Sequence, residues 1–534
     1  MYRYSNGQIS LADFKQPMGM NLKEDNRWVK KAQIIPWNKI EKKYAALFTN
    51  RKGNVAKSVH LALGACIIQA EYGYSDEETA LQIQENPYLQ YFCGYPGYDD
   101  KKLPFDPSLM VYFRKRLTPE ILGSVNEMII AKATKPDEKD DENEEVTEKA
   151  EESESVDDDD DSNNSDNGDG NGNGNGNGND NDNDNDNGNG NGNDNDSDNS
   201  NDSDDNDDDP DNGSGTTNIY ENSGTMIIDA TCAPSNIRYP QDVSLLDDTR
   251  EEAEKLIDEL HSPEDGKKPR TYRRLAHKDY LKYARCRKHN AKTTRKAIGR
   301  QLSYLRRDLD AIDKKLTLGK ALNSRQSERL ETIRTIYSQQ KYMYDHHTHT
   351  VPDRIVSVSQ PFIRPIVRGK AAKPVEFGAK LDISVADGWT RLECFSFDAY
   401  NEAMNLKKIT KRFLKREGHY PSRILADKIY RNRENLRYCK ERGIRLSGPA
   451  LGRPKKGEIR DKAQDYRDEC ERVEVARRFS LAKRKCGMGL VTAKLRETAA
   501  HVIAMSVLVL NLRKIQRAFW QLLDFLLDIF SARG

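Results

Sequence analysis

The feature that most constrains this chain is a long segment of asparagine, aspartate, glycine and glutamate in its middle. Residues 137–217 run from an acidic stretch into alternating Asn-Gly and Asn-Asp repeats. Such a segment has too little apolar surface to offset the entropy lost when it becomes ordered. We therefore predict a disordered linker over 136–217, which divides the 534 residues into a folded domain at 1–135 and another at 218–534.

The formal net charge of +0 is the sum of two opposed regions. Residues 137–211 contain 32 acidic residues and only two lysines, so the rest of the chain carries about thirty excess positive charges. A folded region that basic is expected of a protein that binds nucleic acid. On charge alone, solvated helix surfaces remain the plainer alternative.

Cysteine usage and hydropathy indicate the compartment. The eight cysteines are scattered without a CxxC pair or zinc spacing, and the N-terminus has no secretory signal pattern, so we expect a reduced, cytoplasmic location. Two apolar stretches near the C-terminus, 501–512 and 518–530, are too short or too interrupted by polar residues to cross a bilayer. No membrane partner is expected.

Apolar periodicity predicts a mainly helical N-terminal domain and an α/β C-terminal domain. The predicted N-terminal helices cover 54–73, 76–84, 107–118 and 119–132. The strands and helices of the C-terminal domain are interrupted by a helical insertion at about 243–350. This insertion consists of a helix at 243–260 and a two-helix hairpin that is broken near 318–319. The strands are predicted at 225–231, 355–358, 363–367, 378–385, 390–397, 423–427 and 444–448. The helices of this domain outside the insertion are predicted at 399–417, 433–442, 462–485, 498–512 and 518–530. A turn is predicted at 387–388 and a basic loop at 452–456.

Two aspartates close predicted strands that lie far apart in the sequence, Asp229 and Asp427. Two-metal phosphoryl transfer needs carboxylates that converge from different elements on Mg²⁺ ions roughly 3.5 to 4 Å apart. We therefore take Asp229 and Asp427 as candidate catalytic residues and metal ligands for Mg²⁺, for which Mn²⁺ can substitute. The alternative is that each aspartate only caps a strand or begins a turn.

The sequence around these aspartates resembles that of a known family. Asp-Ala-Thr-Cys-Ala-Pro at 229–234 and Ala-Asp-Lys-Ile-Tyr-Arg-Asn-Arg at 426–433 resemble the first and second aspartate blocks of bacterial insertion-sequence DDE transposases. Residues 377–397 resemble the β-hairpin between them. The N-terminal domain resembles the helical domain that precedes the catalytic domain in many of these enzymes, through the segments 73–77, 85–87, 90–94 and 104–108.

The resemblance implies a ribonuclease-H-like fold for 218–534 and the function of a DNA transposase. Such an enzyme binds the terminal inverted repeats of its element, cleaves the DNA at the ends and joins the freed 3′-hydroxyls to target DNA. Double-stranded DNA would be the partner, with a homodimer or higher oligomer in the synaptic complex. The residues expected to contact DNA are Arg472, Lys483, Arg431, Arg433, Arg273 and Arg274.

The third carboxylate of the family departs from the pattern in this chain. The family places a glutamate four residues after an arginine, three before a phenylalanine and seven before a lysine. Arg472, Phe479 and Lys483 fit, but the glutamate position is Ala476. Glu474 is a weak stand-in, because two residues on a helix correspond to about 200° of rotation.

A methyl group can neither bind a metal nor accept a proton, so we expect this chain to be inactive or impaired in strand cleavage. Three explanations stay open: an engineered inactive variant, a naturally decayed copy, or rescue by Glu474 through a shifted helix register. Two other functions also remain. The chain would be a non-catalytic DNA-binding derivative that represses transposition, or a ribonuclease-H-like nuclease that cuts without joining.

Overall fold

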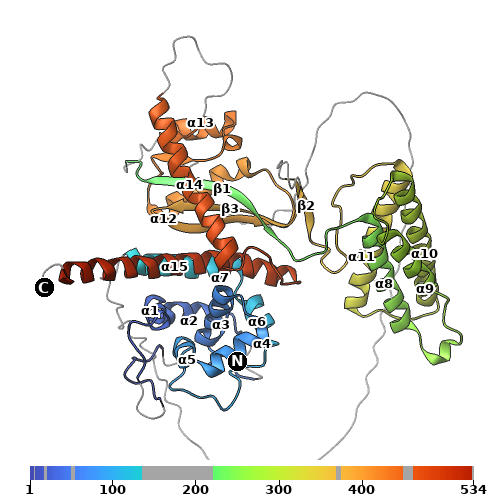
Figure 1. Ribbon diagram of the computed structural model, residues 1–534, viewed down its shortest axis with the longest axis horizontal. Helices are drawn as coiled ribbons and strands as arrows, with labels where there is room; N and C mark the ends of the chain where they lie inside the picture. The colour runs from blue at the N-terminus through green and yellow to red at the C-terminus, as the bar shows by residue number, and fades with distance from the viewer. Residues whose placement is uncertain are drawn as a thin grey trace, which may run out of the picture. The chain divides into compact units, whose positions relative to one another are not determined.

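The computed structural model describes residues 1–4, 7–16, 21–49, 54–134, 221–367, 375–448 and 461–531, with side chains up to residue 518 (Figure 1). The predicted linker at 136–217 and the predicted basic loop at 452–456 lie outside the described residues.

The N-terminal part is helical, as predicted. The helices among its described residues are α1 (Arg27–Ile34), α2 (Trp37–Ala45), α3 (Val59–Tyr72), α4 (Asp76–Glu85), α5 (Pro87–Phe92), α6 (Leu109–Arg116) and α7 (Pro119–Thr134). Helices α1, α2 and α5 were not predicted, because helices of 8, 9 and 6 residues are shorter than the window in which apolar spacing is readable.

The buried centre of this helical part is α3. It begins at Val59 rather than at residue 54, because the Ser58 hydroxyl accepts a hydrogen bond from Leu61 N at 3.3 Å and so caps the helix. It ends at Gly73, whose φ of +73° is a conformation that glycine adopts without strain. Every residue from Val59 to Ile68 is buried, so the helix contacts neighbours on all sides.

One mixed sheet organises the C-terminal part. Its strands in the described residues are β1 (Thr225–Pro234), β2 (Arg364–Val367), β3 (Val375–Ala386), β4 (Trp389–Ser396), β5 (Arg423–Leu425) and β6 (Arg445–Leu446). The order is β2-β3-β1-β5-β6, and β4 also pairs with β3. β3 is antiparallel to β1, β2 and β4, whereas β1, β5 and β6 are parallel.

The predicted turn at 387–388 is confirmed. Asp387 and Gly388 have φ values of +50° and +71°, the paired left-handed conformations of a two-residue hairpin turn. The predicted strand at 355–358 is wrong. Ile355 and Val356 are buried but unpaired, so their apolar character serves packing rather than a β-ladder.

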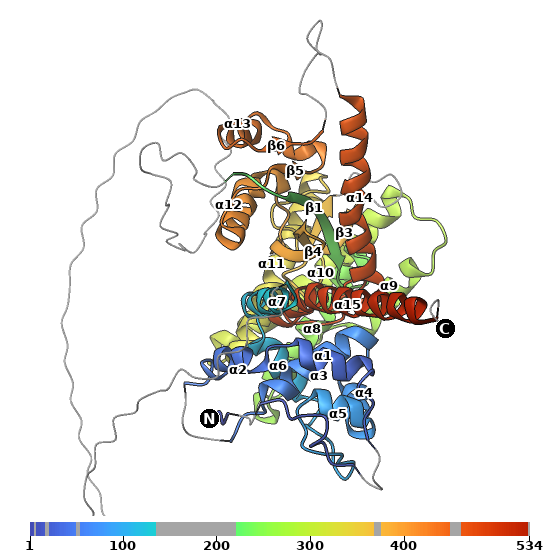
Figure 2. The same cartoon turned by 90° about the vertical axis from the view of Figure 1, so that its left-hand side faces the viewer.

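Helices cover both faces of the sheet (Figure 2). On one face Ile227, Ile383 and Leu425 pack in a cluster with Val475 and Phe479 of α14 (Lys462–Lys485). On the other, Met226, Ile228 and Ile424 pack with residues of α12 (Leu406–Glu417) and α13 (Arg433–Glu441). Two short 3-10 turns, η3 (Glu402–Asn405) and η4 (Lys428–Tyr430), precede these two helices. Asp229 lies in the middle of β1 rather than at the end of its strand as predicted, and its strand is held between these two packed layers.

Between β1 and β2 the chain forms helices α8 (Asp242–Leu260), α9 (Arg273–Ala284), α10 (Ala291–Thr317) and α11 (Ser324–His346). α10 and α11 separate at Leu318 and Gly319, as predicted, and Asn290 and Asn323 each form a capping box at their N-termini. The extra short helix α9 was predicted as part of α10. Helices α8, α10 and α11 share an apolar cluster of their own, which includes Leu256, Leu305 and Ile333.

The C-terminal apolar region is one helix, α15 (Arg496–Ser531), not the two that were predicted. The polar residues between the predicted helices do not interrupt it, because none of them is proline or glycine. Its segment Arg496–Ala518 is long and apolar enough to cross a membrane, contrary to the sequence expectation, but 78% of the apolar window is buried inside the protein. Buried His501 and Asn511 accordingly bond to Leu117 O and Thr390 O.

Candidate functional site

Asp229 and Asp427 occupy equivalent positions beside each other. β1 and β5 run parallel, and the last pair in their register is Ile227 with Leu425. Each aspartate lies two residues beyond this pair, and the backbone at Asp427 is still extended, with φ −69° and ψ 160°. Because side chains alternate along an extended chain, both aspartates leave the sheet on the face that carries Ile227 and Leu425.

The two carboxylates affect each other electrostatically. Asp229 is partly buried, whereas Asp427 is exposed. Burial raises the pKa of Asp229, the negative charges of Asp427 and Glu402 raise it further, and the Ala230 N–H and the Arg472 guanidinium oppose the increase. A cation bound between the aspartates would remove this repulsion.

One oxygen of each aspartate is oriented by the backbone. Ala230 N–H donates to Asp229 Oδ1 at 2.8 Å, and Lys428 N–H donates to Asp427 Oδ1 at 2.7 Å. Within the described ranges, no hydrogen bond or ion pair engages the second oxygen of either carboxylate. Oriented carboxylates with a free oxygen are the ligands that Mg²⁺ and Mn²⁺ prefer, so the donor set fits the implied metal.

α14 presents one row of residues toward β1. Lys483 Nζ donates to Thr231 Oγ1 at 3.0 Å, and the charge of Arg472 acts on Asp229. Ala476 lies one turn beyond Arg472 and two turns before Lys483, so its methyl group shares their face of the helix. It is exposed. A longer side chain at 476 would therefore extend along the side of β1 that carries Asp229.

Glu474 lies on another face of α14. Its carboxylate pairs with Arg478 at 2.7 Å and with Arg477 at 3.6 Å. Its charge also acts on Lys514, whose ammonium donates to Asp387 O in the β3–β4 turn. The structure thus brings Glu474 to the hairpin turn and not beside Asp229.

The arginines expected to contact DNA fall into two groups. The Arg431 guanidinium donates to Leu446 O and to Ser447 O, the second at 3.0 Å, and thereby ties η4 to the end of β6. Arg273 forms an ion pair with Asp258 at 2.8 Å. Arg433 and Arg274 are exposed and form no ion pair with the residues that the structure describes, so their guanidinium groups remain available to an external phosphate.

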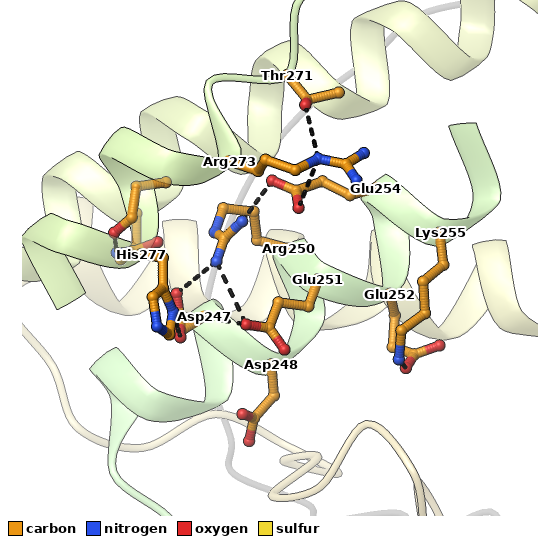
Figure 3. Close-up of polar contacts among 12 residues, drawn as sticks. Asp247, Asp248, Arg250, Glu251, Glu252, Glu254, Lys255, Thr271, Arg273 and His277 are labelled. Atoms are coloured by element: carbon orange, nitrogen blue, oxygen red, sulfur yellow. Dashed lines mark hydrogen bonds and ion pairs between the residues drawn. The ribbon is translucent and has the colours of Figure 1, made fainter. Parts of the chain in front are cut away.

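A second acidic cluster lies among α8 and α9, where Asp247, Glu251 and His277 offer ligand atoms within 4.8 Å of one another (Figure 3). The Arg250 side chain, only 1% exposed, pairs with Asp247 at 2.7 Å and approaches Glu251 to 3.7 Å. A buried guanidinium therefore already pairs with both of these carboxylates. The cluster is therefore an ion-pair network within the helical segment.

Glu402 was not singled out from the sequence, although its negative charge, like that of Asp427, raises the pKa of Asp229. It was included in a helix predicted at 399–417. In the structure it starts the separate turn η3, capped by the Asn401 side chain, which accepts from Ala403 N at 3.1 Å. An asparagine followed by an acidic residue after a strand was the available signal for that turn.

Comparison with known proteins matches two segments of the chain. Residues 18–116 match a family described as a transposase domain (DUF772), and residues 424–513 match a transposase DDE domain. The second segment contains Asp427, Arg472, Ala476 and Lys483. A Rhizobium meliloti protein described as "Uncharacterized protein ORF8 in nfe locus" is 33% identical over 92 residues, which is 17% of this chain and 44% of the relative, so the match spans under half of that relative. No solved structure matches the chain.

Proposed function

We propose that this chain, a DDE transposase of the insertion-sequence kind, binds the terminal inverted repeats of a DNA element through a site centred on Asp229 and Asp427. The observation that carries the proposal is the parallel register of β1 and β5, which sets the two aspartates side by side. Their carboxylates would hold Mg²⁺, or Mn²⁺ in its place. When bound, the metal supplies activation of the attacking oxygen and stabilisation of the leaving oxygen in strand cleavage and strand transfer.

The other residues of the site would position DNA. Arg472 supports this role because its charge already acts on Asp229, and Lys483 because its hydrogen bond to Thr231 holds it over the same strand. Exposed Arg433 and Arg274 would contact phosphates farther along the duplex. Arg431 and Arg273 would act indirectly, by fixing the elements on which they lie.

Ala476 limits what this chain does at the site. The position on α14 that would carry the third carboxylate has only the methyl group of Ala476, which neither binds metal nor moves a proton. We propose that strand cleavage by this chain is impaired, while binding of DNA ends is retained. Because Glu474 is paired with Arg478, we do not assign it the missing role.

The wider organisation follows the same proposal. Residues 218–534 would form a ribonuclease-H-like catalytic domain, which the mixed sheet with helices on both faces supports. Helices α8 to α11 would be an insertion at about 243–350, and 1–135 would bind element ends. The protein would act in the cytoplasm on bacterial DNA, with two or more copies joining the two ends.

End cleavage tests the proposal. Purified protein and its Ala476→Glu variant are incubated with Mg²⁺ or Mn²⁺ and DNA that carries the ends of the element next to the gene. We expect Ala476→Glu to cleave on the order of 10² to 10⁴ times faster than the parent chain. Cys470→Glu is the matched control, because it adds the same charge on an exposed position of α14 that faces about 120° away.

Two outcomes decide between the remaining functions. If Ala476→Glu and the parent protect the ends in footprinting but neither cleaves, the chain is a DNA-binding derivative, the alternative that Ala476 itself favours. If Ala476→Glu cleaves but does not join pre-cleaved ends to target DNA, it is a nuclease. Cleavage that persists in Ala476→Glu combined with Asp229→Asn would contradict the assigned site.

A further inference from the structure

A hollow of about 250 Å³ lies where the C-terminal half of α14 meets α15 (Figure 1). Among the described residues its lining contains five basic side chains, two leucines and an alanine, and no acidic side chain. The basic residues are Arg478 and Lys485 of α14 and Arg513, Lys514 and Arg517 of α15. We call this feature the basic hollow. Because like charges repel, their convergence in one place favours an anion as the missing partner.

The basic hollow is separate from the site at Asp229. Arg478 and Lys485 are seven residues apart on α14, which is close to two helical turns, so they share one face of the helix. Ala476 and Lys483, which face β1, each precede one of them by two residues. Two residues correspond to about 200° of rotation. The basic hollow therefore lies on the side of α14 that faces away from β1.

The β3–β4 turn brings two of the cations together. Lys514 Nζ donates to Asp387 O in this turn at 2.8 Å. A Cβ atom placed on Gly388 would lie 2.9 Å from Lys514 Nζ and 3.5 Å from Arg478 Nη2, so both cations approach the same point of the backbone. Burial first, and the charge of Arg478 next, lower the pKa of Lys514 to about 8, although Asp387 and Glu474 act in the opposite direction. An anion in the basic hollow would offset both of the lowering influences.

The carboxylates near the basic hollow already have partners. Glu474 pairs with Arg478 at 2.7 Å. Glu71 of α3 approaches Arg513 only to 4.0 Å and pairs with buried Lys31. Three cations of the basic hollow form no ion pair within the part of the chain that the structure describes: Lys485, Lys514 and Arg517. The described carboxylates therefore leave an excess of positive charge there.

Hydrogen-bond donors are also left over. Arg478 Nε is buried and has no hydrogen-bond partner among the described residues, and a buried donor without a partner costs free energy. One Arg513 nitrogen donates to Lys485 O at 3.2 Å, which ties α15 to the end of α14. Guanidinium and ammonium groups gathered in this way are the groups that proteins use to bind phosphate.

We propose that the basic hollow is a phosphate-binding site for the backbone of double-stranded DNA, separate from the site at Asp229 and Asp427. The choice of DNA as the source of the phosphate rests on the proposed function. A backbone fits better than one free phosphate, because the seven residues between Arg478 and Lys485 span about 10 Å along the helix. Contacts of this kind position a duplex without reading its sequence. They require neither the metal nor a carboxylate at position 476.

Salt dependence of DNA binding tests the proposal on the full chain. The variant is Lys485→Gln combined with Arg517→Gln, and the ligand is a duplex of unrelated sequence. Phosphate contacts release counterions, so we expect the slope of log affinity against log salt to fall by about 1 to 2. Affinity at about 0.1 M salt should fall about tenfold or more. Since neither side chain forms an ion pair in the described part of the chain, the urea midpoint should match that of the parent.

Lys462→Gln combined with Arg467→Gln is the matched control, because it removes two exposed cations from the other end of the same helix. It should leave the slope close to that of the parent. An equal fall in slope in the control would show a general effect of charge and overturn the proposal. An unchanged slope in the Lys485 and Arg517 variant would also overturn it and leave the proposed function intact. A parent chain that binds no DNA would instead contradict the proposed function.

The lysines of the basic hollow give a local readout that separates DNA from free phosphate. At pH 8 Lys514 is partly uncharged and should react with an acetylating reagent, and mass spectrometry locates the products. We expect duplex DNA to protect Lys485 and Lys514, but not exposed Lys462, whereas inorganic phosphate at the same phosphate concentration should protect none of them. Equal protection by inorganic phosphate would assign a site for a small anion and overturn the choice of DNA. Bound DNA that leaves both lysines reactive would overturn the site itself.

Discussion

Lys483 of α14 donates a hydrogen bond to Thr231 of β1 across 3.0 Å, which links two residues 252 positions apart. This contact holds the C-terminal half of α14 over the strand that carries Asp229. It therefore determines where the residues on the same helix face, including Ala476, lie relative to the aspartates.

The Lys483–Thr231 contact should be measurable as a coupling free energy. We expect Lys483→Met and Thr231→Val each to lower the free energy of unfolding. The double variant should lower it by less than the sum of the two single variants, with a coupling free energy of about 0.5 to 1.5 kcal/mol. Urea unfolding of the four proteins measures it. Additive effects would show that the hydrogen bond does not hold α14 on β1.

Asp308 of α10 should make stability depend on pH. Burial raises its pKa to about 8, the charge of Glu254 adds to the increase, and its Oδ2 has no partner among the described residues. The folded state therefore retains a proton that the unfolded state loses near pH 4. Stability should fall between pH 4 and 8, by at most about 1.4 kcal/mol per pH unit from this group.

Asp308→Asn removes that proton linkage, so its advantage over the parent should grow with pH across this window. Denaturant unfolding at pH 5 and pH 8 measures the difference. Asp310→Asn is the control, because Asp310 is exposed on the same helix. An advantage of Asp308→Asn that is equal at both pH values would contradict the assignment.

Asn511 of α15 should be important for joining the N-terminal helices to the sheet. Its buried amide accepts from Thr390 N at 3.0 Å and donates to Thr390 O and to Asn126 Oδ1, both at 2.8 Å. Asn511→Leu leaves Thr390 N and Asn126 Oδ1 without this partner, at about 1 to 3 kcal/mol for each orphaned group, whereas Thr390 O keeps the hydrogen bond from the Asn126 amide at 3.2 Å. Thermal unfolding should show the loss, whereas exposed Arg517→Ala on the same helix should change little.

The acidic segment should compete with DNA for the basic surface of the folded parts. Deleting 137–211 removes 32 acidic residues and two lysines, so non-specific DNA binding at low salt should tighten. Filter binding at two salt concentrations measures the change, which should shrink at high salt. Unchanged affinity at low salt would exclude competition.

The local sequence pattern was sufficient to predict the long helices and the hairpin. The helices at 242–260 and 462–485 and the hairpin around Asp387-Gly388 were predictable because their periodicity, caps and turn residues are encoded within a few positions. The short helices α1, α2 and α5 were not, because packing against neighbours stabilises elements that carry too few residues to show a period.

The sequence by itself determined the residue types of the candidate site: two aspartates after apolar strands, an arginine and a lysine at helical spacing, and an alanine where the resemblance implies a glutamate. Only the tertiary structure decided which of them meet. Strand register sets Asp229 beside Asp427, and helix docking points Glu474 toward the hairpin turn. No local sequence pattern contains this information, because proximity across a fold depends on how distant segments pack.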